Sequence, residues 1–111
     1  MDRVLIADQQ PVSREGLRRV LEAELGWEVA AEVEDGKAAL RQAIETHPDI
    51  AVLDNYLPLV SGIEVTRQIR EQLPNTEVLI FGMHDGERLV GEAVRAGARG
   101  YVLKEPLNIS A

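Results

Sequence analysis

Ile50-Ala51-Val52-Leu53-Asp54 is the stretch that decides the fold of this chain, because a short and fully apolar run ends there on a carboxylate. Short apolar runs rich in Val and Ile are typical of buried strands in a parallel sheet. Two more runs have this form, since Val4–Ala7 ends on Asp8 and Tyr101–Leu103 ends on Lys104. Ligands collect at the carboxyl ends of parallel strands. The sequence therefore predicts a site for a cation and an anionic group, built from two carboxylates and one ammonium group.

Helical and strand patterns alternate along the whole chain. The predicted strands are Val4–Ala7, Trp27–Val33, Ile50–Leu53, Val78–Phe81 and Tyr101–Leu103. The predicted helices are Val12–Leu25, a segment with the apolar stripe Ala39–Ile44, Ile63–Leu73, and a shorter segment through Val90 and Val94. The second of these helices ends at His47-Pro48-Asp49, and the last ends at Gly97. Five strands and four helices in strict alternation predict a doubly wound α/β fold with a parallel sheet.

Length and composition exclude several classes of protein. The 111 residues, 45% of them hydrophobic, predict one domain with a single core over residues 1–111. Without cysteine, the chain has no disulfide and no thiolate site. No apolar stretch is long enough to cross a membrane and no signal-peptide pattern opens the chain, so we expect a cytoplasmic protein. The net charge of −7 argues against direct binding of nucleic acid or an anionic membrane.

One face of the predicted sheet lacks part of its cover. Doubly wound sheets normally carry helices on both faces, and the chain ends at Ala111, where a fifth helix would follow the last strand. Two explanations stay open for this missing or truncated helix. The sequence is a piece of a longer protein, or a partner or second copy packs against the open face.

A series of short motifs occurs in a fixed order along the chain. The motifs are Val4–Asp8, Pro11 with Arg14–Leu17, Asp35-Gly36, Ala39-Leu40, Pro48–Asp54, Leu57-Pro58, Gly62, Met83–Asp85, Ala96–Ala98, Gly100-Tyr101 and Lys104. In this order they resemble the receiver domain of bacterial two-component response regulators, in the subgroup joined to a helix-turn-helix DNA-binding domain. The resemblance implies a flavodoxin-like, five-stranded parallel sheet of order 2-1-3-4-5. Any output domain would lie beyond Ala111.

The resemblance also implies roles for individual residues. Asp54 would accept a phosphoryl group from a histidine kinase. A carboxylate oxygen is a weak nucleophile, so the transfer depends on neutralising and positioning the phosphoryl oxygens. Mg²⁺ would supply most of that neutralisation, held by the carboxylates of Asp8 and Asp54 and the backbone carbonyl of Tyr56. Lys104 would pair with the phosphoryl group as a point charge. Tyr101 matches the family's aromatic that moves inward on activation, or else packs on the surface of the last strand.

Two positions inside the implied site depart from the family pattern. Most receivers have a second acid directly after the Asp8 position, and this chain has Gln9 there. A glutamine amide offers an oxygen without net charge, so the site has fewer anionic ligands and Mg²⁺ binding should weaken. The run Val78–Phe81 ends on Gly82, where the family has a serine or threonine. That hydroxyl binds the phosphoryl oxygen and carries the switching signal, and glycine can do neither.

Three functions are compatible with these residues. The first is a phosphorylated receiver that controls a DNA-binding output as a homodimer, so that DNA is contacted only by that output. The second is a phosphorylation-independent receiver that acts as a protein–protein or dimerisation module. The third is a small phosphatase with Asp54 as its nucleophile. That reaction would require a general acid and a substrate pocket, and the sequence shows neither, so we expect a receiver and not an enzyme.

Overall fold

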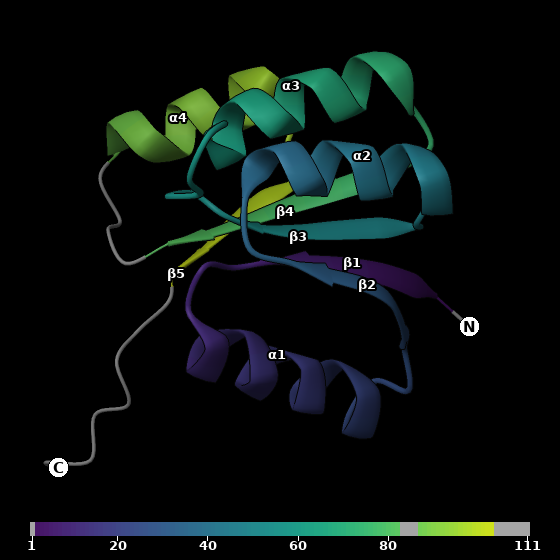
Figure 1. Cartoon of the computed structure of the whole chain (residues 1–111). Helices are drawn as coiled ribbons and strands as arrows, with labels where there is room; N and C mark the ends of the chain where they lie inside the picture. Colours follow the sequence, from purple (N-terminus) through teal and green to yellow (C-terminus); the bar gives the residue numbers. More distant parts are fainter. Residues whose placement is uncertain (1, 83–86, 104–111) are drawn as a thin grey trace, which may run out of the picture.

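A parallel sheet with helices on both faces forms the molecule (Figure 1). The computed structural model describes residues 2–82 and 87–103. Its elements are β1 (Arg3–Ala7), α1 (Pro11–Ala23), β2 (Glu28–Val33), α2 (Gly36–Thr46), β3 (Ile50–Asp54), α3 (Gly62–Gln72), β4 (Glu77–Gly82), α4 (Glu87–Ala96) and β5 (Gly100–Leu103). The strands lie in the order β2-β1-β3-β4-β5, and every neighbouring pair is parallel. The predicted fold and strand order are confirmed.

The two faces of the sheet carry different numbers of helices. Figure 1 shows α1 on one face and α2, α3 and α4 on the other. Successive side chains of a strand point to opposite faces, and the central strand β1 divides accordingly. Leu5 and Ala7 belong to the core under the three helices, while Val4 and Ile6 belong to the core beside α1. Both sides of β1 are therefore buried, as the continuous apolar run predicted.

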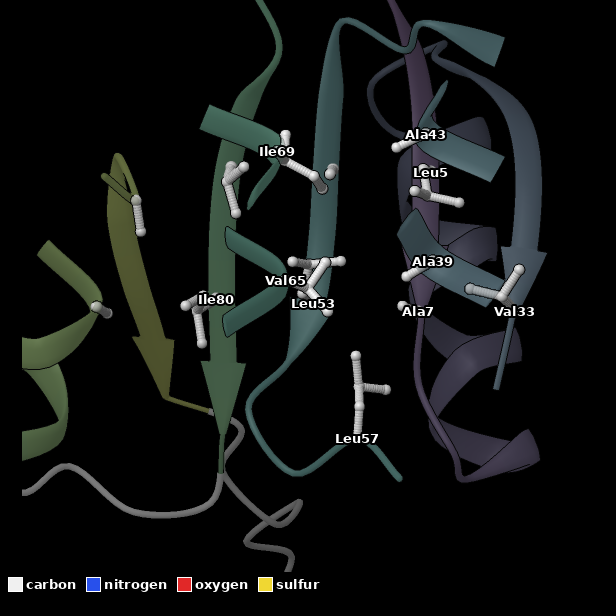
Figure 2. Close-up of a cluster of buried hydrophobic side chains, with 14 residues drawn as sticks. Leu5, Ala7, Val33, Ala39, Ala43, Leu53, Leu57, Val65, Ile69 and Ile80 are labelled. Atoms are coloured by element: carbon white, nitrogen blue, oxygen red, sulfur yellow. The ribbon is translucent and has the colours of Figure 1, made fainter. Parts of the chain in front are cut away.

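The larger core fills the space between the sheet and the three helices (Figure 2). Figure 2 shows Leu53 and Ile80 from the strands facing Val65 and Ile69 from α3. All four side chains are at most 1% exposed. Burying a side chain of this size contributes about 1.5–3 kcal/mol. This packing fixes β3 and α3 against each other directly beneath the carboxyl end of β3.

The opposite face contains an apolar groove beside α1. The groove has a volume of about 220 Å³ and is lined by Leu17, Leu21, Leu25, Trp27, Val52, Leu79, Phe81 and Val102. Within residues 2–82 and 87–103, α1 is the one helix on this face. The incomplete cover agrees with the prediction from sequence. No helix in the described ranges is long and apolar enough to cross a membrane.

Helix ends differ slightly from the predicted boundaries. We expected the first helix to continue to Leu25, but α1 ends at Ala23. The chain then turns into β2 through Gly26, whose φ of +68° is readily accessible to glycine. Backbone bonds from Gly26 to Glu22 (3.2 Å) and from Trp27 to Leu21 (3.0 Å) close the last turn. Leu25 is left 53% exposed because the turn carries it to the rim of the groove.

Candidate functional site

Asp8 and Asp54 lie on neighbouring strands at the carboxyl edge of the sheet. β1 and β3 pair in register up to Ala7 and Leu53, and the two aspartates are the next residues on each strand. Asp8 is fully buried and Asp54 is 7% exposed. Charged residues are rarely buried this deeply unless they are paired or bind a cation. The structure therefore brings together the two carboxylates that the sequence placed in one site.

Hydrogen bonds on both sides of Asp8 hold it in place. The Gln10 amide donates to its Oδ1 atom at 2.9 Å, and its own amide donates to the Val33 carbonyl at 3.1 Å. Arg14 donates from Nη1 to the Asp8 carbonyl at 2.8 Å. The same guanidinium lies 3.5 Å from a carboxylate oxygen of Glu32 on β2. Arg14 thus connects α1 to two strands directly behind the site.

Backbone bonds position Asp54 and the segment that follows it. The Tyr56 amide donates to its Oδ1 atom at 2.9 Å. The Asn55 amide donates to the Phe81 carbonyl at 2.9 Å, which extends the pairing of β3 with β4 by one residue. The Gly62 amide at the start of α3 donates to the Asn55 carbonyl at 3.1 Å. Together these bonds fix the direction of the Asp54 carboxylate.

Two glycines allow the segment after Asp54 to pack tightly. A Cβ atom at Gly62 would overlap the backbone carbonyl oxygen of Asp54. A Cβ atom at Gly36 would overlap the carbonyl oxygen of Val60. The Gly36 amide also donates to the Pro58 carbonyl at 3.0 Å. The loop between β3 and α3 is therefore clamped at both ends by backbone contacts, which explains the glycines at these positions.

The residues at this edge fit a divalent cation with a reduced set of ligands. The carboxylates of Asp8 and Asp54 and the carbonyl of Tyr56 are hard oxygen donors, the type that Mg²⁺ prefers. Gln9 is exposed beside them and brings no charge. Among the described residues, no group of three or more His, Cys, Asp or Glu side chains is arranged to hold a metal ion. Water would therefore have to complete the coordination of Mg²⁺ here.

Gly82 and Tyr101 meet on the other half of the edge. A Cβ atom at Gly82 would overlap the Tyr101 hydroxyl oxygen, and would lie 3.3 Å from the ring carbon Cζ. The Tyr101 ring packs against the larger core, on the face of the three helices. Tyr101 is partly buried there, and its movement on activation stays a prediction. The predicted lysine of the site, Lys104, lies outside the described residues.

Sequence reasoning gave Arg14 no role at the site. Arg14 enters the sequence prediction only as one residue of a motif. In the structure Arg14 bonds to the Asp8 backbone, and Gln10 is the residue at the N-terminal cap of α1 whose amide bonds to the Asp8 carboxylate. An arginine in the first turn of a helix that follows a strand ending on an acid is the signal that could have identified this contact.

Comparison with known proteins assigns the chain to a family. Residues 4–109 match the family described as "Response regulator receiver domain". The chain belongs to the response regulator receiver family. The "Uncharacterized transcriptional regulatory protein YxjL" of Bacillus subtilis (strain 168) is 43% identical to this receiver over 105 residues, which cover 95% of this chain and 48% of that protein. The receiver spans about half the length of the curated relatives it matches.

Solved receiver structures share its fold. The signal receiver domain of the response regulator NarL from Mycobacterium tuberculosis superposes with a TM-score of 0.90 at 35% identity, over 95% of this chain and 85% of that one. The CheX-CheY-BeF3-Mg+2 complex from Borrelia burgdorferi gives a TM-score of 0.89 at 27% identity, over 96% of this chain and 80% of that one. The fold and the family match therefore agree that this chain is a response regulator receiver domain.

Proposed function

We propose that this receiver accepts a phosphoryl group on Asp54 and thereby controls a transcriptional output. The observation that carries the proposal is the pair of buried carboxylates, Asp8 fully buried and Asp54 7% exposed, at adjacent strand ends. Surrounding backbone bonds orient Asp54, so its nucleophilic oxygen is positioned before any donor binds. The relatives are transcriptional regulators, which favours a regulatory role over an enzyme acting on a separate substrate.

The chemical step transfers one phosphoryl group without an external oxidant or reductant. A carboxylate oxygen of Asp54 forms the new O–P bond while the N–P bond of a phosphohistidine on the kinase breaks. The departing imidazole takes a proton, and Asp54 becomes a mixed anhydride. Such transfers depend chiefly on in-line positioning and on stabilising the charge of the phosphoryl oxygens. In this receiver Asp8 and the fixed loop provide the positioning, and Lys104 is the proposed cation for the phosphoryl oxygens.

Mg²⁺ is the proposed metal of the site. Mg²⁺ held at this site would neutralise part of the charge on the phosphoryl oxygens. Asp8, Asp54 and the Tyr56 carbonyl would hold the ion, with weaker affinity than in a receiver that has an acid at the position of Gln9. The Borrelia burgdorferi complex, a receiver structure of the same fold, contains both BeF3 and Mg²⁺, which supports this choice of metal.

The proposed partners follow from this chemistry. A histidine kinase would donate the phosphoryl group, and a homodimer would form upon phosphorylation in the cytoplasm. DNA would be contacted only through an output domain outside residues 1–111, since the net charge of −7 does not suit contact with DNA phosphates. The alternative is a phosphorylation-independent receiver, which the uncharged Gln9 and the missing hydroxyl at Gly82 favour.

Phosphorylation can be tested by mass spectrometry of the intact protein. We expect incubation with acetyl phosphate and Mg²⁺ to add one phosphoryl group per chain, and Asp54→Asn to remove that gain. Asp49→Asn is the matched control because Asp49 is a carboxylate near the opposite end of the same strand, where it accepts a bond from the Arg3 amide at 2.8 Å. If the wild-type protein gains no mass at any Mg²⁺ concentration, the phosphorylation-independent alternative is correct.

A further inference from the structure

The space next to Gly82 is filled by an oxygen atom from another strand. A side chain at residue 82 would begin where the Tyr101 hydroxyl lies, because even a Cβ atom there would overlap that oxygen. A serine or threonine hydroxyl would sit one covalent bond beyond its Cβ. The Tyr101 oxygen therefore occupies the volume in which a hydroxyl of residue 82 would be found. Asn55, which follows Asp54, lies at the same point, with its Cβ 3.5 Å from the position of the missing atom.

The pairing of β4 and β5 explains how the ring reaches this point. Tyr101 is aligned with Ile80, and Gly82 is the next residue of β4 that points to the same face. A tyrosine side chain is long enough to extend from one such position to the next. Its ring is partly buried and packs on the larger core together with Ile80, which places the hydroxyl at the rim of the site. Glycine at residue 82 is what leaves the required room.

We propose that the Tyr101 hydroxyl replaces the missing hydroxyl of residue 82 and donates a hydrogen bond to the phosphoryl group on Asp54. This inference rests on the proposed function. A phenol hydroxyl can both donate and accept a hydrogen bond. Tyr101 on β5 then provides both the aromatic ring and the hydroxyl, whereas the family has the hydroxyl on β4, at the position of Gly82.

The position of the ring can be tested without any phosphoryl ligand. The chain has two tyrosines, so 3-fluorotyrosine labelling gives two ¹⁹F resonances, and the one lost in Tyr101→Phe belongs to Tyr101. We expect Gly82→Ala to displace the ring and raise the H₂O/D₂O isotope shift of that resonance toward the value of an exposed tyrosine. An unchanged Tyr101 resonance in a folded Gly82→Ala protein would overturn the inference.

The donor role can be tested with beryllofluoride and Mg²⁺ as the phosphoryl analogue. Hydrogen bonds to charged groups are the stronger kind, so we expect Tyr101→Phe to weaken binding by about tenfold or more. The decisive comparison uses two double variants that differ by one oxygen atom. Gly82→Ser with Tyr101→Phe should restore most of the affinity, because a hydroxyl returns to the same volume. Gly82→Ala with Tyr101→Phe should bind as weakly as Tyr101→Phe alone.

Failure of the inference and failure of the proposed function give different results. If the wild type binds beryllofluoride and Tyr101→Phe binds it equally well, the donor role is wrong and the acceptor role of Asp54 stands. Equal affinities of the two double variants would lead to the same conclusion. If the wild type itself binds no beryllofluoride at saturating Mg²⁺, the phosphoryl site is wrong and the inference falls with it.

Discussion

The two halves of the candidate site are built from different kinds of contact. At the end of β3, Gly62 is forced to be glycine by a backbone atom, the carbonyl oxygen of Asp54. At the end of β4, the atom that opposes a side chain on Gly82 is the hydroxyl at the tip of Tyr101. A backbone carbonyl cannot yield without shifting β3, whereas a ring can rotate. The acidic half of the site is therefore rigid and the hydroxyl half is adjustable.

The same contrast applies to the two positions, Gln9 and Gly82, that we expect to differ from the family pattern. The acidic half contains Asp8 and Asp54, with a tightly packed loop behind them, and Gln9, the predicted departure from the family pattern, is exposed. In the hydroxyl half, the Tyr101 hydroxyl lies where a Cβ atom of residue 82 would be. Substitutions in the two halves should thus differ in the size of their effect on stability or Mg²⁺ affinity. They should also differ in which second substitution compensates for that effect.

The largest effect is expected at the rigid half. Gly62→Ala places a Cβ atom onto the Asp54 carbonyl oxygen, so β3 or α3 must shift within a packed core. Such overpacking costs about 1–3 kcal/mol of unfolding free energy, and we expect a value near the upper end because the opposing atom is backbone. Urea unfolding followed by circular dichroism measures it.

Gly16→Ala is the matched control for this glycine. Gly16 lies within α1 and has nothing within 4 Å of the position of its missing Cβ atom. Replacing it by alanine should stabilise the protein by about 0.5–1 kcal/mol, because alanine is the better helix former. Equal effects of the two substitutions would show that the Asp54 backbone is not fixed as the structure describes.

An effect of intermediate size is expected from restoring charge to the acidic half. Gln9→Asp adds an anionic oxygen beside Asp8 and Asp54, so Mg²⁺ affinity should rise about tenfold or more, equivalent to about 1.4 kcal/mol. The measurement is a Mg²⁺ titration followed by the fluorescence of Trp27, the one tryptophan, or by calorimetry. Gln72→Asp, a change of the same type at an exposed residue at the end of α3, is the control. An unchanged Mg²⁺ affinity would show that Gln9 does not limit the metal site.

The smallest effect is expected at the adjustable half. Gly82→Ala should cost about 1 kcal/mol of unfolding free energy, less than Gly62→Ala, because the Tyr101 ring can rotate away from the new methyl group. In a Tyr101→Phe background the cost should fall, since the overlapping oxygen is gone and the ring carbon lies 3.3 Å from the new atom. A double-mutant cycle in urea measures this coupling. Purely additive effects would mean that the two residues do not touch in solution.

Much of the fold could be predicted because its strands have a local signature. The apolar runs of β1 and β3 end on Asp8 and Asp54, and the sheet brings both to one edge, as their sequence patterns indicated. The helix boundaries were less accurate because the turn through Gly26 depends on how α1 meets β2. The prediction that Lys104 joins the site stays a prediction, since it lies outside the residues that the structure describes.

The features of the site that the sequence did not predict depend on contacts between distant segments. From the family resemblance, the sequence predicts that a serine or threonine hydroxyl is missing at Gly82. It cannot show that Tyr101 enters the space, since that depends on the register of β4 with β5 and on the packing of the ring. The bond from Arg14 to the Asp8 carbonyl likewise requires α1 to lie at a particular angle to β1.

The position of β5 at the edge of the sheet affects how often this part of the site opens. β5 is the outermost strand next to β4, whereas β1 and β3 lie inside the sheet. Edge segments open locally at a lower free-energy cost than the central core, so their amide hydrogens exchange sooner with solvent. The amides of β5 should exchange before those of β3 under native conditions. If Tyr101 provides the hydroxyl of the site, local opening of β5 would remove that hydroxyl for as long as the strand is open. A partner that slows hydrogen exchange in β5 would therefore also lengthen the time for which the hydroxyl stays in the site.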